Sequence, residues 1–241
     1  MIAVIPVEGL PEIGEGDDLA ELIAAAATLE DGDVVCVAHK VVSKAEGRVA
    51  RLDGVEPSDL ARELSGQDGD PRRLELVLRE AVRILRARPP LVIAETRHGF
   101  VCASAGVDAS NAPEAEMVVL LPEDPDASAA RLRTGLEQRT GKSLGVVVTD
   151  TFGRAWRFGI ANVAIGAAGI EVLRDLRGEH DPVGYELHST VIAVADEIAA
   201  AAELVMGKTE RVPVAVVRGL DVQGEGTARE LVMPPEQDLF R

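Results

Sequence analysis

Apolar positions along the chain form short continuous runs in some places and recur at helical spacing in others. Continuous apolar runs bounded by Gly, Pro or Asp predict strands at residues 2–5, 34–37, 91–95, 100–103, 117–121, 144–148 and 212–217. Apolar residues recurring every three or four positions predict helices at residues 19–26, 57–64, 71–88, 126–139 and 185–205, the last being the longest. Residues 160–173 are apolar but rich in Gly and Ala, and we interpret them as a strand. The alternation of strands and helices predicts a mixed α/β (α+β) fold.

The charge balance excludes one class of function. The chain of 241 residues carries 41 acidic and 25 basic side chains, a net charge of −16, which argues against binding to nucleic acid. Its 46% hydrophobic content excludes a disordered acidic tail. No apolar run is long enough to cross a membrane, and the start has no basic region typical of a secretory signal, so we expect no membrane partner. Cys36 and Cys102 lie in apolar runs, which predicts buried thiols in a reducing compartment, the cytoplasm.

Lysine is rare in this chain, with four residues against 21 arginines. This ratio has a simple compositional reading, the codon bias of a GC-rich genome. However, Lys40 and Lys44 fall together in the predicted turn after the strand at residues 34–37, where His39 also lies. A site that needs compact ammonium groups at a phosphate gives the same pattern.

Familiar nucleotide-binding motifs are not matched. Gly135 and the segment 141–143 (Gly-Lys-Ser) are spaced wrongly for a P-loop, and the segment follows a predicted helix and precedes a strand. Neither of the Gly-Glu-Gly segments, at residues 14–16 and 224–226, has the third glycine of a dinucleotide fingerprint. If the chain binds a nucleotide, it does so through a different kind of binding loop.

Two aspartates stand at the ends of predicted strands. Asp108 and Asp150 each follow an apolar run and enter a loop rich in Gly, Ser, Thr or Asn. Either can be a simple turn cap, which is the commoner role of an aspartate in a loop. Together with Thr151 they also form a hard oxygen-ligand set suited to magnesium or manganese. The sequence leaves both readings open.

Arginines follow closely after Asp150. Arg154 and Arg157 suit the clamping of an anionic substrate, although the start of a surface helix uses the same residues. The one tryptophan, Trp156, lies between them, either in a binding loop or as a core anchor.

With these blocks assembled, the chain closely resembles the coenzyme F420-0:L-glutamate ligases, GTP-dependent enzymes that add glutamate to a 5-deazaflavin coenzyme. The resemblance runs essentially end to end, through IPVEGLPEI, HKVVSKAEGR, SAGVDASN, VVVTDTFGRAWR, NVAIGAAG and VPVAVVRG. It implies a two-lobed ligase fold that is neither a P-loop nor a Rossmann fold, seen as an intertwined homodimer. We therefore expect residues 1–241 to form a single ligase unit of two interleaved lobes, either free-standing or the N-terminal part of a longer fused polypeptide.

The resemblance also implies roles for particular residues. The residues expected at GTP are Gly9, Leu10, Pro11, Glu12, His39, Lys40, Lys44, Asn111, Met206, Gly207, Lys208, Thr209, Glu210, Arg211, Val212 and Pro213. Asp108 and Asp150 are expected on the first of two divalent cations (magnesium or manganese) and Thr151 near the second, with potassium as a further candidate ion. Some relatives carry an acidic or amide side chain at the position of Lys208, and a protonated lysine cannot ligate a cation. That leaves Thr151, Glu210, backbone oxygens or water for the second cation.

The implied reaction is amide formation between L-glutamate and the terminal carboxylate of coenzyme F420-0 or its dehydro form. GTP activates this carboxylate as an acyl phosphate, GDP and phosphate are released, and γ-linked glutamate addition follows. Arg154 or Arg157 is expected to hold a substrate carboxylate or phosphate. The alternatives are a glutamate ligase for another acidic cofactor, a folate or pterin, and a non-catalytic deazaflavin-binding module.

Overall fold

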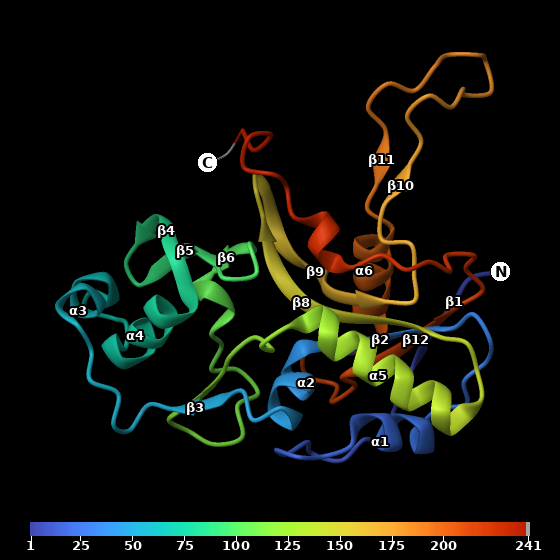
Figure 1. Cartoon of the computed structure of the whole chain (residues 1–241). Coiled ribbons are helices and arrows are strands. Elements are labelled where there is room, and N and C mark those ends of the chain that lie inside the picture. Colours follow the sequence, from blue (N-terminus) through green and yellow to red (C-terminus); the bar gives the residue numbers. More distant parts are fainter. Residues whose placement is uncertain (240–241) are drawn as a thin grey trace.

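A five-stranded sheet in the order β1-β12-β2-β8-β9 organises the larger part of the molecule, as seen in a computed structural model that describes residues 1–239 (Figure 1). Its parallel pair, β2 and β8, lies at the centre, and every other neighbouring pair is antiparallel. The strands are β1 (Ala3–Pro6), β2 (Val34–Ala38), β8 (Gly145–Arg154), β9 (Arg157–Ala168) and β12 (Val214–Arg218). The predicted mixed α/β fold is confirmed.

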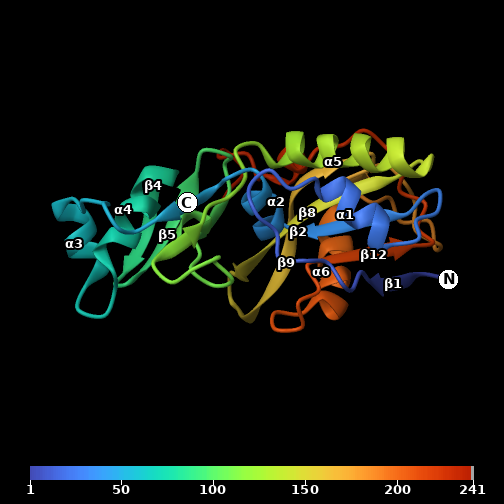
Figure 2. The same ribbon diagram turned by 90° about the horizontal axis from the view of Figure 1, so that it is seen from below.

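Helices cover both faces of this sheet (Figure 2). Helices α1 (Leu19–Ala26) and α5 (Pro125–Thr140) pack with Val35 and Val37 on one face. Helix α6 (Val194–Met206) packs on the other face, where Val34 and Cys36 of the same strand point. Because successive side chains of a strand point to opposite faces, a strand buried on both sides needs an unbroken apolar run, as β2 has.

Residues 49–119 build a second region with its own core. Strand β3 (Val49–Arg51) pairs with β7 (Met117–Val119), and a separate sheet has the order β4-β5-β6. The remaining elements of this region are α3 (Asp59–Ser65), α4 (Pro71–Glu80), β4 (Ala81–Arg88), β5 (Leu91–Thr96), β6 (Val101–Ala103) and the 3-10 turn η1 (Ser104–Gly106). Figure 1 shows this region beside the five-stranded sheet, and the chain enters it from the short helix α2 (His39–Ala45) and leaves it from β7 toward α5. A second 3-10 turn, η2 (Ala228–Leu231), lies near the C-terminus.

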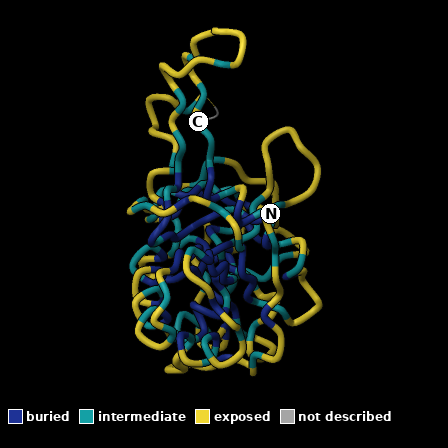
Figure 3. Tube along the Cα trace, turned by 90° about the vertical axis from the view of Figure 1, so that its right-hand side faces the viewer, coloured by how far each residue is buried: buried dark blue, intermediate teal, exposed yellow. Residues whose placement is uncertain are grey.

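Two predicted helices are wrong in part. The helix predicted at residues 71–88 ends at Glu80, and the chain continues as β4 because β5 supplies backbone hydrogen-bond partners that override the helical spacing. The helix predicted at residues 185–205 starts only at Val194, so α5 and not α6 is the longest helix. Residues 174–192 instead form a projecting arm, in which β10 (Arg174–Asp175) pairs with β11 (Val191–Ile192) and an isolated bridge joins His180 to Glu186. None of the arm's residues is buried, so no apolar face supports a helix there (Figure 3).

Strand β8 is longer than its apolar run predicts. The predicted strand at residues 144–148 continues through Asp150 to Arg154, and it forms a long hairpin with β9. The strand interpretation of residues 160–173 is confirmed as far as Ala168. Both cysteines are buried, as predicted, and burial raises the pKa of each thiol to about 12. Within residues 1–239, no helix has the length and apolar character needed to cross a membrane.

Candidate functional site

A cavity of about 770 Å³ opens where the parallel strands β2 and β8 meet helix α2. Ala38, the last residue of β2, is in register with Thr149 of β8, so the side chains that follow both positions line one space. The expected nucleotide and metal residues in its lining are Leu10, Pro11, Glu12, His39, Lys40, Lys44, Asp108, Asn111, Asp150, Thr151, Met206, Gly207, Lys208, Thr209, Arg211, Val212 and Pro213. Its size is within the range of about 300–1,000 Å³ typical of small-molecule sites.

Three of the four lysines of the chain line this cavity. Lys40 and Lys44 come from α2, which replaces the turn predicted after β2, and Lys208 comes from the loop after α6. Lys44 is buried and contacts Glu12 Oε1 at 2.5 Å. Because the chain otherwise uses arginine, composition alone does not explain why three of its four lysines lie together in this cavity.

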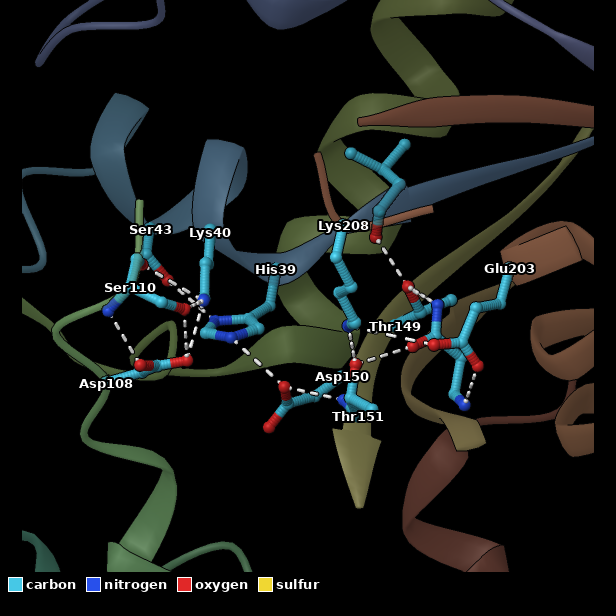
Figure 4. A network of polar contacts seen from close by, with 12 residues as sticks. His39, Lys40, Ser43, Asp108, Ser110, Thr149, Asp150, Thr151, Glu203 and Lys208 are labelled. Carbon is cyan, nitrogen blue, oxygen red and sulfur yellow. Dashed lines mark hydrogen bonds and ion pairs between the residues drawn. The ribbon is translucent and has the colours of Figure 1, made fainter. Parts of the chain in front are cut away.

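Asp108 is a turn cap and also an ion-pair partner of Lys40. Its Oδ1 accepts the Ser110 N–H at 2.7 Å, as a turn cap does, while its Oδ2 accepts from Lys40 Nζ at 2.6 Å (Figure 4). Burial by itself raises the pKa of this carboxyl, but the Lys40 ammonium and the Ser110 N–H outweigh burial and hold the pKa below its usual range. The carboxylate is therefore ionised at neutral pH.

Asp150 lies inside β8, in register with Val163, and is not the strand end that the sequence predicts. Its Oδ1 is 3.2 Å from His39 Nε2 and accepts the Thr151 N–H at 2.7 Å. Burial raises the pKa of the Asp150 carboxyl, but the charge and hydrogen bond of His39 outweigh burial and lower the pKa overall. The turn-cap reading is wrong for this residue, because the backbone here is a paired strand.

The two aspartates fit a divalent cation. Both are ionised carboxylates that face one cavity, which is the donor chemistry magnesium and manganese prefer. No group of three or more His, Cys, Asp or Glu side chains within residues 1–239 is arranged to hold a metal ion by itself. A cation at Asp108 and Asp150 therefore needs further oxygens, such as those of a bound phosphate or water.

The position expected for a second cation has a different character. Lys208 Nζ contacts Thr151 Oγ1, and it lies 3.7 Å from Glu203 Oε1 (Figure 4). Glu210, an alternative ligand, does not line the cavity, because its carboxylate accepts from the N–H and hydroxyl of Thr209 at 2.8 and 2.9 Å. These hydrogen bonds lower the pKa of Glu210. The residues here do not fit a second divalent cation.

Several expected residues lie outside the lining. Gly9 precedes the lining residue Leu10 and has a φ of +77°, a conformation that glycine adopts without strain. Arg154 and Arg157 lie at the exposed tip of the β8–β9 hairpin, where Arg154 Nη2 donates to the Phe158 carbonyl at 3.2 Å. Trp156 between them is 84% exposed, which excludes the core-anchor reading.

Sequence reasoning missed several polar residues at the site, among them Ser110, Asn162 and Glu203. Ser110 Oγ contacts Lys40 Nζ at 2.5 Å, Asn162 bonds to Thr151, and Glu203 of α6 accepts the Asn162 N–H at 2.8 Å. Ser110 and Asn162 fall in the blocks SAGVDASN and NVAIGAAG, so the signal for them was present. Glu203 had none, because its position in the site depends on how α6 packs against β9.

Comparison with known proteins identifies the family of this chain. A sequence model of the F420-0:Gamma-glutamyl ligase family matches residues 9–219. Among similar curated proteins is the coenzyme F420:L-glutamate ligase of Methanopyrus kandleri, 49% identical over 100% of this chain and 97% of that protein. The proteins of the same name from Archaeoglobus fulgidus and Methanothermobacter thermautotrophicus are 46% and 42% identical, over 100% of this chain and 96% and 99% of theirs. The chain therefore belongs to the F420-0:Gamma-glutamyl ligase family.

Proposed function

We propose that this chain is a GTP-dependent ligase that joins L-glutamate to the terminal carboxylate of coenzyme F420-0 or its dehydro form, and then adds further γ-linked glutamate. Membership of the family supports the ligase reaction, and the names of its relatives support the two substrates. The observation that carries the nucleotide part is the cavity, in which three of the chain's four lysines face two ionised aspartates.

An amide does not form from a carboxylate and an amine in water without activation. We infer that the acceptor carboxylate attacks the γ-phosphorus of GTP, which forms an acyl phosphate and releases GDP. The glutamate amine then attacks the acyl carbon, the amide bond forms, and phosphate leaves as the amine loses a proton. Such a reaction needs positioning and charge neutralisation more than covalent catalysis by the protein.

The lysines have the task of neutralising phosphate charge. Lys40 is held toward the cavity by Asp108 and by the Ser110 carbonyl at 3.0 Å, so its ammonium is positioned before the nucleotide binds. Lys44 is held in the same way by Glu12. Asn111, with a φ of +55°, and the segment after α6 form the rest of the nucleotide wall.

Asp108 and Asp150 would hold a divalent cation, magnesium or manganese. Such a cation, when bound, supplies positive charge to the phosphate oxygens during transfer. His39, 2% exposed, fixes the orientation of the Asp150 carboxylate from behind. A potassium ion is also expected, and the only support for it is the family resemblance.

Arg154 and Arg157 are proposed to hold an anionic group of the acceptor. Their hairpin borders the cavity, because Ile160 of the same hairpin belongs to the cavity lining. The exposed positions of both arginines suit a large substrate that extends out of the cavity toward the hairpin tip.

A homodimer is proposed from exposed apolar side chains on projecting segments. Trp156 and Phe158 at the hairpin tip are 84% and 105% exposed, and Val183 and Tyr185 on the arm are 89% and 62% exposed. Large apolar groups gathered on projections are typical of surfaces that another chain covers.

Mass spectrometry of the deazaflavin product tests the function. The purified chain is incubated with coenzyme F420-0, L-glutamate, magnesium and either GTP or ATP. We expect a glutamylated product with GTP and little with ATP. Equal turnover with ATP contradicts the guanine preference, and glutamylation of a folate but not of the deazaflavin contradicts the substrate.

A further inference from the structure

The Lys208 ammonium stands at the end of a directed line of hydrogen bonds in the cavity wall (Figure 4). Lys208 Nζ donates to Thr151 Oγ1, and Thr151 Oγ1 in turn donates to Asn162 Oδ1 at 2.7 Å. A hydroxyl has one proton, and here that proton points at Asn162. Thr151 therefore offers only lone pairs toward Lys208, which makes it an acceptor for a cation at this position.

The direction of this line is fixed by buried groups. Asn162 is 5% exposed, and its Nδ2 donates to Thr149 Oγ1 at 3.4 Å, which leaves its Oδ1 to face Thr151. Its backbone N–H donates to Glu203 Oε2 at 2.8 Å, which holds the Glu203 carboxylate beside the site. The other oxygen of that carboxylate, Oε1, lies 3.7 Å from Lys208 Nζ. The Lys208 ammonium thus lies beside one carboxylate, that of Glu203, and one hydroxyl, that of Thr151.

A divalent cation on Thr151 competes directly with this ammonium. Two positive charges a few ångströms apart repel each other. The oxygen ligands that such a cation needs, Thr151 and Glu203, are the two groups that Lys208 already contacts. The ammonium also has three donors, so after bonding Thr151 it keeps donors for an anion in the cavity.

We propose that the Lys208 ammonium takes the place of a second divalent cation, so that this chain binds its nucleotide with one divalent cation and with Lys208 directly on the phosphate oxygens. This inference rests on the proposed function for the nucleotide itself. It assigns a separate place to each positive charge. The metal is at the Asp108 and Asp150 end of the cavity, and the Lys208 ammonium is at the Thr151 end.

Counting bound manganese tests the inference without any turnover. The full chain is mixed with an equimolar, non-hydrolysable GTP analogue and titrated with Mn²⁺, and the loss of the electron paramagnetic resonance signal of free Mn²⁺ gives the number bound per chain. We expect one Mn²⁺ per chain for the unmodified protein. Lys208→Glu is expected to bind two, because a third oxygen ligand then joins Thr151 and Glu203. Lys208→Met is expected to bind one and to weaken binding of the analogue about tenfold, since a charged hydrogen bond to phosphate is lost.

Lys142 supplies the matched control, because it is the one lysine of the chain that does not line the cavity, and its Nζ lies at the surface, 3.1 Å from Asp31 Oδ2. Lys142→Glu and Lys142→Met should bind one Mn²⁺ and keep the affinity of the unmodified chain. Two Mn²⁺ per chain in the unmodified protein, one in Lys208→Glu, or unchanged affinity in Lys208→Met overturns the inference alone. Failure of the unmodified chain to bind the analogue is a separate result, which overturns the proposed function and this inference with it.

Discussion

His39 Nε2 lies 3.2 Å from Asp150 Oδ1, across the junction between α2 and β8. Both residues line the cavity, and the imidazole is buried there. The two residues are 111 positions apart in the chain, and the parallel register of β2 with β8 brings them together. Contact with His39, together with the Thr151 N–H and Lys40, thus holds the pKa of a carboxylate at the cavity below its usual range.

Asp150→Asn should remove activity while the fold survives. The change keeps the shape of the side chain but removes the charge that a cation needs, so kcat/KM should fall by about 10²-fold or more. Because His39 lowers the pKa of Asp150, the carboxylate stabilises the fold, and the unliganded Tm should fall slightly. The increase in Tm on adding GTP and magnesium should shrink, since it follows ligand affinity. Near-normal activity in this variant would falsify the assignment of Asp150 to a metal.

The ion pair of Asp108 with Lys40 should make stability depend on pH in a defined direction. The pKa of Asp108 is lowered on folding, so its stabilising contribution is present above the unfolded value of about 3.9 and is lost as the pH falls through the lower folded value. We expect the free-energy difference in unfolding between the unmodified chain and Asp108→Asn to shrink on acidification. Urea unfolding from about pH 6 down to about pH 3 measures it.

Asp196 provides an internal control of opposite sign for this measurement. Burial raises the pKa of its carboxyl on folding, against one hydrogen bond from the Ala164 N–H at 2.8 Å. Protonation therefore relieves a cost, and the unmodified chain should gain stability relative to Asp196→Asn as the pH falls. The same slope in both variants would contradict the assignment of these two shifts.

Arg157→Met should affect substrate binding but not stability. The side chain is exposed at the hairpin tip, so its loss leaves no cavity or unpaired buried group, and Tm should be unchanged. If it holds an anionic group of the acceptor, the KM for the deazaflavin should rise about tenfold. Steady-state kinetics with the acceptor varied give this value. Arg88→Met, another exposed arginine at the end of a strand far from the hairpin, serves as the control, and an equal effect there would remove the specific role.

Replacing the apolar side chains of the hairpin tip should weaken the homodimer. Trp156→Ser with Phe158→Ser removes two large exposed apolar groups and leaves the buried core untouched. Light scattering at micromolar protein should give a dimer mass for the unmodified chain and a lower mass for the double variant. A monomer mass for the unmodified chain would show that these side chains have another role.

Much of the site was readable from the sequence because its residues occupy short continuous segments. HKVVSK directly follows the buried strand β2, GVDASN begins at the last residue of the turn η1, and each segment carries several polar groups. Residues that lie within a few positions of one another can be compared along the sequence, and the four residues predicted in this way, Lys40, Lys44, Asp108 and Asp150, all line the cavity. The sequence also excluded a P-loop, because that motif is defined by the spacing of a few neighbouring residues.

The sequence by itself determined the central strands, the helix of residues 126–139 and the groups that carry charge in the cavity, because burial and local spacing are written along the chain. Only the tertiary structure decided where residues 81–88 and 149–154 pair as strands, since the partner strands β5 and β9 supply hydrogen bonds that no local pattern reveals. It also decided what each charged group faces. Lys208 meets Thr151 and Glu203 only because α6 packs against β9, and a contact between distant elements depends on packing and not on sequence spacing.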